Sequence, residues 1–287
     1  MWKRRGPQRI QIKSAEQIEL MRVAGLVVGR TLDRLREAVK PGVTTADLDR
    51  LAEESIRDQG GVPSFRGVPG PLMPFPAVIC ASVNDEIVHG IPRTDKVLRD
   101  GDVISIDCGA IVGGWHGDAA ITVPVGEIAP ELETLLMVTE ESLWRGLAAG
   151  HAGGRLSDIS HAIESYIRSQ PHPGGRYGIV EGYGGHGIGT EMHMDPMVPN
   201  HGAAGQGPEL VPGMALAVEP MVNLGTKGTR ELNDGWTVAT ADGRYSAHFE
   251  HSFAVTVDGP WVLTAVDGGR ERIAELNSGQ NRPKGEN

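Results

Sequence analysis

Five side chains of the kinds that bind hard divalent cations lie between residues 107 and 250. They are four carboxylates and one imidazole: Asp107, Asp118, His186, Glu219 and Glu250. Each carboxylate lies in an apolar, strand-like stretch, where a lone charge would be costly to bury. Oxygen-rich ligation with a single imidazole suits Mn, Fe(II), Co or Zn. The sequence therefore predicts a buried site for two divalent metal ions and leaves the identity of the metal open.

Each of these residues has a simpler interpretation when it is taken alone. An aspartate at a strand end, such as Asp107 or Asp118, often caps a turn. A lone histidine is more often structural than a ligand, and a buried glutamate can stay neutral as a hydrogen-bond donor. The metal interpretation depends on the whole set, two glutamates in one strand pair and two aspartates in another. Cys108 is excluded as a metal ligand, because strand alternation points its thiol to the face opposite Asp107. We interpret it as a small buried hydrophobic residue.

The sequence around His186 excludes several familiar kinds of site. The segment 182–189 contains a Gly-x-Gly-x-x-Gly match, but no apolar strand precedes it, so a nucleotide loop is rejected. We expect its glycines to let the backbone approach a bound group closely and to expose His186 to a ligand. His193 follows without a His-Glu-x-x-His motif, which excludes the usual mononuclear zinc-protease helix. A serine hydrolase is disfavoured because there is no Gly-x-Ser-x-Gly elbow.

The elements that position these residues can be predicted from capping and periodicity. A capping box at Ser14–Gln17 opens the first helix. Helices are expected at about 14–39, 44–60, 131–149 and 157–169, and antiparallel strand pairs at 103–107 with 119–123 and at 215–219 with 249–257. Two helices followed by a strand pair with two carboxylates occur twice. This predicts one α/β domain (α+β type) with pseudo-twofold halves, spanning residues 12–267, between a flexible basic N-terminus (1–11) and a polar, disordered tail (268–287).

Composition limits the class of protein. The chain has 287 residues, 39% of them hydrophobic, and a formal charge of −10, which argues against a DNA-binding protein. Its two cysteines, Cys80 and Cys108, form no disulfide framework, and no run of about 18 apolar residues suggests a membrane span. The first residues are basic but lack the apolar run of a secretory signal. These features predict a cytoplasmic protein.

Five separated motifs resemble those of type I methionine aminopeptidases, and the resemblance runs from about Ile12 to Asp267. The matching segments are Asn84–Pro92, Ile106–Gly109 with His116–Asp118, Gly185–Gly189, Glu219–Pro220 and Phe249–His251. The resemblance implies the pita-bread fold, an antiparallel sheet with helices on one side. It also implies a hydrolase that removes the initiator methionine from nascent chains when the second residue is small. We expect a monomer, although no motif in the sequence determines the oligomeric state.

The resemblance also assigns roles to individual residues. Asp107 and Asp118 would hold one metal ion, and Asp118 and Glu250 would bridge to a second ion that His186 and Glu219 complete. Glu219 would act as general base, while His89 and His193 would contact the substrate near the scissile bond. The methionine side chain would be bordered by Trp236, Phe75, Cys80 and Met192, although Met192 stands where an aromatic residue is expected.

Three other functions compete with this one. The first is an Xaa-Pro aminopeptidase of the same fold, which usually carries a whole domain before the metal region. The second is a non-catalytic pita-bread binding protein, which would tend to have lost ligands. The third is a structural α/β domain, which would leave four strand-borne carboxylates unexplained. The basic residues Lys3, Arg4, Arg5 and Arg9 are either a solvated end or a transient contact to ribosomal RNA.

Overall fold

A curled, nine-stranded antiparallel sheet organises the molecule. The structure is a computed structural model and describes residues 10–172 and 174–280. The strand order is β1-β4-β5-β14-β9-β7-β8, with β2 paired to β4 and β15 paired to β14. These strands are β1 (Val62–Pro63), β2 (Ile79–Val83), β4 (Val103–Val112), β5 (Trp115–Pro124), β7 (Gly185–Gly187), β8 (Met194–Val198), β9 (Ala215–Val218), β14 (Glu250–Thr256) and β15 (Gly259–Val262).

Two small sheets flank the main one. One has the order β13-β10-β6 and the other β11-β12-β3. Their strands are β3 (Glu86–Val88), β6 (Gly178–Ile179), β10 (Met221–Asn223), β11 (Thr229–Glu231), β12 (Val238–Thr240) and β13 (Ser246–His248). The helices are α1 (Ala15–Ala38), α2 (Thr45–Asp58), α3 (Pro130–Ala149), α4 (Leu156–Ser169) and α5 (Arg270–Gln280). Within the described part of the chain, no helix is long and apolar enough to cross a membrane.

Both predicted strand pairs are present, and they meet in the middle of the sheet. Strands β4 and β5 form a hairpin that closes at Gly113 and Gly114, both with positive φ, and is longer than predicted. Such a two-residue turn matches the twist of the strands and lets pairing continue to its edge. Strands β9 and β14 form the second pair, and β14 lies against β5 through Glu250 opposite Ala120. The two halves thus join along β5 and β14, as a pseudo-twofold arrangement requires.

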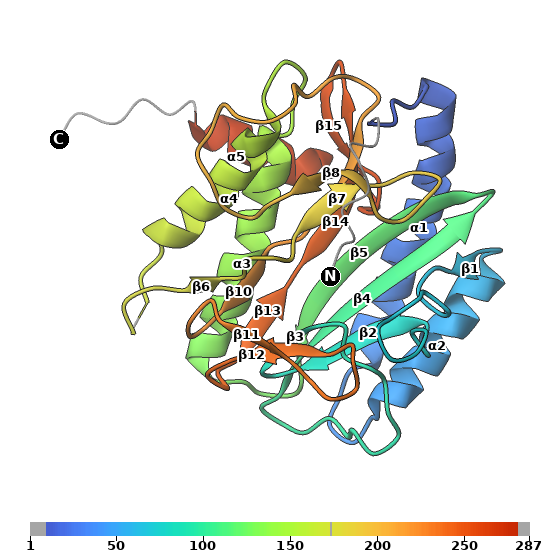
Figure 1. Cartoon of the computed structure of the whole chain (residues 1–287), viewed down its shortest axis with the longest axis vertical. Helices are drawn as coiled ribbons and strands as arrows, with labels where there is room; N and C mark the ends of the chain where they lie inside the picture. Colours follow the sequence, from blue (N-terminus) through green and yellow to red (C-terminus); the bar gives the residue numbers. More distant parts are fainter. Residues whose placement is uncertain (1–9, 173, 281–287) are drawn as a thin grey trace.

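The helices cover one face of the sheet, as Figure 1 shows for α1 and α3. The expected capping box of α1 is present, since Ser14 and Gln17 bond each other's backbone N–H groups. Helix α1 lies so close to β5 that a Cβ on Gly117 would be 2.7 Å from the backbone nitrogen of Gly25. This packing buries the back of the sheet in the main core and leaves the other face for the carboxylates.

The prediction of a disordered tail from Gly268 is wrong for residues 270–280, which form α5. The prediction relied on the polar composition of this segment. It missed two apolar residues, Ile273 and Leu276, whose buried side chains hold the helix against the rest of the protein. The carboxylate of Asp267 accepts hydrogen bonds from the backbone of Gly269 and Glu271 at the start of this helix. At the other end of the chain, Gln11 bonds Thr190 rather than belonging to a free arm. Residues 1–9 and 281–287 lie outside the described residues.

Candidate metal centre and substrate pocket

Asp107 and Asp118 reach the same face of the sheet from neighbouring strands. In the hairpin register Asp107 is opposite Ala120, and Asp118 is opposite Gly109. The two carboxylates are therefore diagonal neighbours on one face, within reach of each other. Cys108 points to the other face and lies in the main core, as strand alternation predicts.

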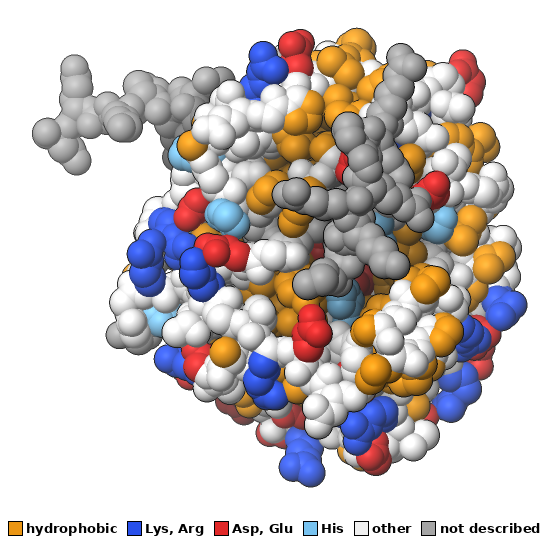
Figure 2. Space-filling model, viewed as in Figure 1, with side chains coloured by type: hydrophobic (Ala, Val, Ile, Leu, Met, Phe, Trp, Pro, Cys, Tyr) orange, Lys and Arg blue, Asp and Glu red, His pale blue; other side chains and the backbone are white. Residues whose placement is uncertain are grey.

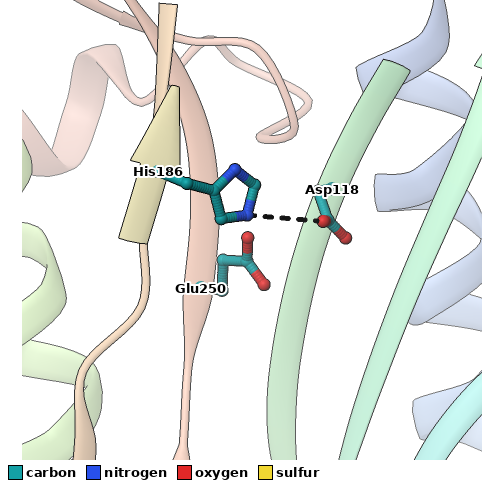
Figure 3. Close-up of side chains that lie close together, drawn as sticks. All are labelled: Asp118, His186 and Glu250. Atoms are coloured by element: carbon teal, nitrogen blue, oxygen red, sulfur yellow. Dashed lines mark ion pairs between the residues drawn. The ribbon is translucent and has the colours of Figure 1, made fainter. Parts of the chain in front are cut away.

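His186, Glu219 and Glu250 come to this pair from three further parts of the sheet. Figure 3 shows Asp118 on β5, His186 on β7 and Glu250 on β14 pointing toward one another. One ligand atom from each of these three residues lies within 4.8 Å of the other two. His186 Nε2 is 3.9 Å from Asp118 Oδ2 and 3.8 Å from Glu219 Oε1. Glu219 follows directly after β9, so its carboxylate joins the same cluster.

The orientation of His186 suits a metal ligand. Its Nδ1 lies 2.9 Å from the carbonyl oxygen of Gly187. A carbonyl can only accept, so Nδ1 carries the proton and Nε2 turns its lone pair toward the carboxylates. The ring is buried, at 2% exposure, which restricts its other orientations.

Burial and mutual repulsion shift the pKa values of the clustered carboxyl groups. Burial raises the pKa of Asp107 to about 7. Burial and the neighbouring carboxylates raise the pKa of both Asp118 and Glu250 well above the usual range. For Glu219 burial also acts to raise the pKa, but the imidazoles of His248 and His186 outweigh it and lower the pKa. Of the four carboxyl groups, only Glu219 has a pKa that its surroundings lower.

The donor set fits divalent metal ions. Within residues 10–172 and 174–280, three buried carboxylate oxygens have no hydrogen-bond partner: Asp107 Oδ1, Asp118 Oδ1 and Glu250 Oε1. Buried oxygens are rarely left unpaired in native proteins, and a bound cation would satisfy all three. Oxygen donors plus one imidazole nitrogen are the ligands expected for a hard or borderline divalent ion.

The two glycines next to His186 have a packing role that the sequence did not predict. A Cβ on Gly185 would be 2.1 Å from the carbonyl oxygen of Ala217, and one on Gly187 would be 2.2 Å from that of Asp195. These glycines therefore let β7 pass between neighbouring backbone segments. Gly182 and Gly184 of the same segment line the cavity together with His186.

A cavity of about 470 Å³ opens beside the carboxylates. All the residues predicted to contact substrate line it, namely Phe75, Cys80, His89, Met192, His193 and Trp236. Four of these, Phe75, Cys80, Met192 and Trp236, pack in one apolar cluster. On the face shown in Figure 2, hydrophobic side chains gather around an area where acidic and histidine side chains are also visible. The cavity thus joins an apolar compartment to a polar reacting end.

Besides His186, two further histidines line the cavity, His89 and His193. The ring of His193 lies 4.5 Å from that of His186, centroid to centroid. His89 lies between Tyr183 and Trp236, with centroid distances of 6.0 and 6.2 Å. Burial lowers the pKa of His89 to about 4, so its ring is neutral at pH 7. Its φ of 60° is unusual for a residue other than glycine and aims the ring into the cavity.

Comparison with known proteins settles the family. Metallopeptidase family M24 matches residues 19–257. The methionine aminopeptidase of Clostridium acetobutylicum is 51% identical over 258 residues, covering 90% of this chain and all of the relative. Methionine aminopeptidase 1 of Mycobacterium tuberculosis is 52% identical over 261 residues, covering 91% and 97%. The chain belongs to the methionine aminopeptidases of metallopeptidase family M24.

Solved methionine aminopeptidases also share the fold. The structure from Rickettsia prowazekii superposes with a TM-score of 0.84 at 38% identity, covering 90% of this chain and all of the other. The expected pita-bread fold is therefore confirmed. An Xaa-Pro dipeptidase from Bacillus anthracis matches at a TM-score of 0.68 and 23% identity, and this chain covers 61% of it. That likeness is one of fold alone.

Several residues of this aminopeptidase's site were not predicted. The cavity is also lined by Tyr183, Met197, Met221 and Glu231. His248 is buried beside the cluster, with Nε2 3.6 Å from Glu219 Oε2. Its position two residues before Glu250 could have revealed it, because alternate residues of an extended chain point to the same side. In the structure His248 ends β13 and Glu250 begins β14. The four lining residues carry no such signal, since they come from separate segments.

Proposed function

We propose that this chain removes the N-terminal methionine from nascent proteins and peptides whose second residue is small. The observation that carries the proposal is the junction of an apolar cavity with a cluster of four carboxylates and a histidine. The relatives named methionine aminopeptidase, about half identical over nearly their whole length, support the same activity. An Xaa-Pro peptidase is less well supported, because the similarity to such enzymes is low.

The proposed centre holds two divalent ions through Asp107, Asp118, His186, Glu219 and Glu250. Co, Mn, Fe(II) and Zn all suit these donors. Bound divalent ions would lower the pKa of an attacking water and polarise the scissile carbonyl. The protein must supply the ligands as anions, although burial favours protonated Asp107, Asp118 and Glu250.

The remaining steps belong to side chains of the cavity. Glu219 would accept the proton of the attacking water and deliver it to the leaving amine. His193 would donate a hydrogen bond to the developing oxyanion, and neutral His89 would bond the peptide nitrogen. The methionine side chain would lie against Trp236, Phe75, Cys80 and Met192, where a polarizable thioether packs well with aromatic rings.

The proposal also covers cellular location, oligomeric state and contact with the ribosome. We place the enzyme in the cytoplasm, where nascent chains emerge, and as a monomer. Transient contact with the ribosome through Lys3, Arg4, Arg5 and Arg9 is also proposed. Deleting residues 1–9 should reduce co-sedimentation with ribosomes without reducing turnover of a short peptide.

The activity is tested by the release of free methionine from Met-Ala-Ser, with Pro-Ala-Ser as the control peptide. The protein is stripped with a chelator and reconstituted with Co, Mn, Fe(II) or Zn. Metal-dependent cleavage of the methionine peptide alone is expected, and the rates rank the metals. Failure to cleave with any metal, despite binding of two ions, would refute the activity and favour a binding protein.

A further inference from the structure

The loop of residues 66–75 lies against the turn that carries Trp236. The indole Nε1–H of Trp236 donates a hydrogen bond of 3.0 Å to the carbonyl oxygen of Met73. The ring of Phe75 meets the indole edge-to-face, with a centroid distance of 5.0 Å. Leu72 lies over Gly235, where an added Cβ would be 2.8 Å from Leu72 Cγ. Three contacts therefore join the loop to one wall of the cavity.

The loop and the turn are each stabilised by their own internal hydrogen bonds. In the loop, the backbone N–H of Phe75 donates to the carbonyl of Val68 at 2.8 Å. In the turn, Asp234 Oδ1 accepts from the backbone N–H groups of Trp236 and Thr237 at 2.9 and 2.8 Å. The indole is thus held between the loop of residues 66–75 and the turn at Asp234, and its position depends on how closely the loop can approach it.

Gly70 is the part of the loop that lies behind the indole. A Cβ at this position would be 2.3 Å from Cζ2 and 2.5 Å from Cε2 of Trp236, and 2.6 Å from the carbonyl oxygen of Met73. Distances under about 3 Å force a shift of one of the groups. The φ of Gly70 is not among the positive values, so space rather than backbone conformation requires glycine here.

A side chain at residue 70 would move the indole toward the cavity. Gly70 contacts Trp236 but does not line the cavity, whereas Trp236 lines it together with Phe75 and His89. An indole pushed away from residue 70 would therefore enter the space that Trp236 borders. The Met73 carbonyl would also be displaced, which weakens the hydrogen bond that orients the ring. The apolar compartment would become narrower where the first side chain of a substrate lies.

We propose that Gly70 is a specificity-determining residue, because the absence of a side chain lets the Trp236 indole lie back against the loop and leaves room for an unbranched, methionine-sized side chain. This inference rests on the proposed removal of N-terminal methionine. Gly70 does not touch the substrate and acts through the position of Trp236.

The test compares Gly70→Ala with the wild type on Met-Ala-Ser and on norvaline-Ala-Ser, whose first side chain is shorter. We expect kcat/KM for the methionine peptide to fall about tenfold, mainly through KM, as for a methylene-sized misfit in an apolar pocket. The norvaline peptide should lose less, so that the preference for methionine decreases. Gly154→Ala is the matched control, since its added Cβ would come no closer than 3.3 Å to other atoms.

A second comparison separates a local effect from damage to the fold. In a Trp236→Phe background the indole atoms that a methyl group at position 70 would meet are missing, and the Met73 carbonyl, which no longer accepts a hydrogen bond from the indole, is free to shift away. Adding Gly70→Ala to this background should therefore lower kcat/KM for Met-Ala-Ser by less than about twofold. Additive losses, or an unchanged methionine preference in Gly70→Ala, would overturn the inference while leaving the activity of the wild type intact. Absence of methionine release by the wild type itself would instead refute the proposed function, and with it the inference.

Discussion

The imidazole of His248 lies beside the carboxylate of Glu219, with Nε2 3.6 Å from Oε2, and both groups are buried on the side of the metal cluster. Its backbone is fixed by Thr122, whose hydroxyl donates to the carbonyl of His248 and accepts from its N–H. Among the described residues, His248 Nε2 has no hydrogen-bond partner. At this separation, a shift of a few tenths of an ångström, roughly, would bring the two groups within hydrogen-bond distance.

His248→Ala should therefore weaken metal binding. Groups that orient a ligand typically contribute a factor of about 10 to 100 in affinity, and we expect a loss in that range. Titration calorimetry of the metal-free protein with Mn or Co measures it without reference to turnover. The exposed His161 provides the control, and His161→Ala should bind metal like the wild type. Unchanged affinity in His248→Ala would show that Glu219 needs no support from this ring.

Asp118→Asn should abolish metal binding and reduce turnover by a factor of about 1,000 or more, because a shared anionic ligand is replaced by a neutral one. The metal-free variant should be at least as stable as the wild type, since a buried carboxyl group surrounded by others is removed. Calorimetry, methionine release and thermal unfolding together test this. Asp258→Asn, at an exposed turn, is the control and should leave all three unchanged. Normal activity in Asp118→Asn would refute the proposed ligand set.

The stability of the metal-free protein should depend on Asp107 between about pH 4 and 7. Burial raises the pKa of Asp107 to about 7, whereas an unfolded aspartate has a pKa near 3.9. The folded state therefore binds more protons in this window, and the contribution of Asp107 to stability falls as pH rises through it. Asp107→Asn lacks this loss. Its free energy of unfolding, relative to that of the wild type, should therefore rise by on the order of 1–3 kcal/mol from pH 4 to 7.

Urea unfolding of the metal-free proteins at several pH values measures this difference. Asp258→Asn serves again as the control, and its difference from the wild type should stay flat. A constant difference for Asp107→Asn across the window would mean that Asp107 stays ionised in the folded, metal-free protein. With metal added, the wild type should become more stable than Asp107→Asn above pH 7, because a bound cation favours the anionic ligand.

Gly185→Ala should destabilise the protein by about 2–4 kcal/mol, as expected for forced overpacking in a buried sheet. Its Cβ would be 2.1 Å from the carbonyl oxygen of Ala217, where β7 passes β9. Denaturant unfolding with metal present measures the loss. In this case Gly154→Ala should cost less than about 1 kcal/mol, because its Cβ would come no closer than 3.3 Å to other atoms and needs only a small shift of its neighbours. Equal stability of the two variants would contradict the tight passage of β7.

Local patterns in the sequence were sufficient for the main elements. The capping residues of α1 (Ser14 and Gln17) and of α2 (Thr44 and Asp47) act over a few neighbouring positions, so they can be read directly. The glycine-rich segment between the two strands predicted the β4–β5 hairpin, but not its two-residue turn at Gly113 and Gly114. The carboxylates in apolar strands were informative for the same reason: a buried charge needs a partner wherever the strand is placed. The register of the hairpin then brings Asp107 and Asp118 together without help from the rest of the fold.

Contacts between distant segments could not be predicted this way. Helix α5 depends on Ile273 and Leu276 finding an apolar surface, which its polar composition does not reveal. The glycines around His186 are set by the backbones of β8 and β9, which only the assembled sheet brings near.

The sequence by itself determined which groups can do chemistry, because charge, burial pattern and turn geometry are properties of short stretches of chain. Only the tertiary structure decided their arrangement. The pairing of β5 with β14 brings Glu250 beside Asp118, 132 positions earlier in the chain (250 − 118). The packing of the 66–75 loop on Trp236 sets the width of the cavity. Both depend on side-chain and backbone contacts whose partners are far apart in sequence, so no local pattern encodes them.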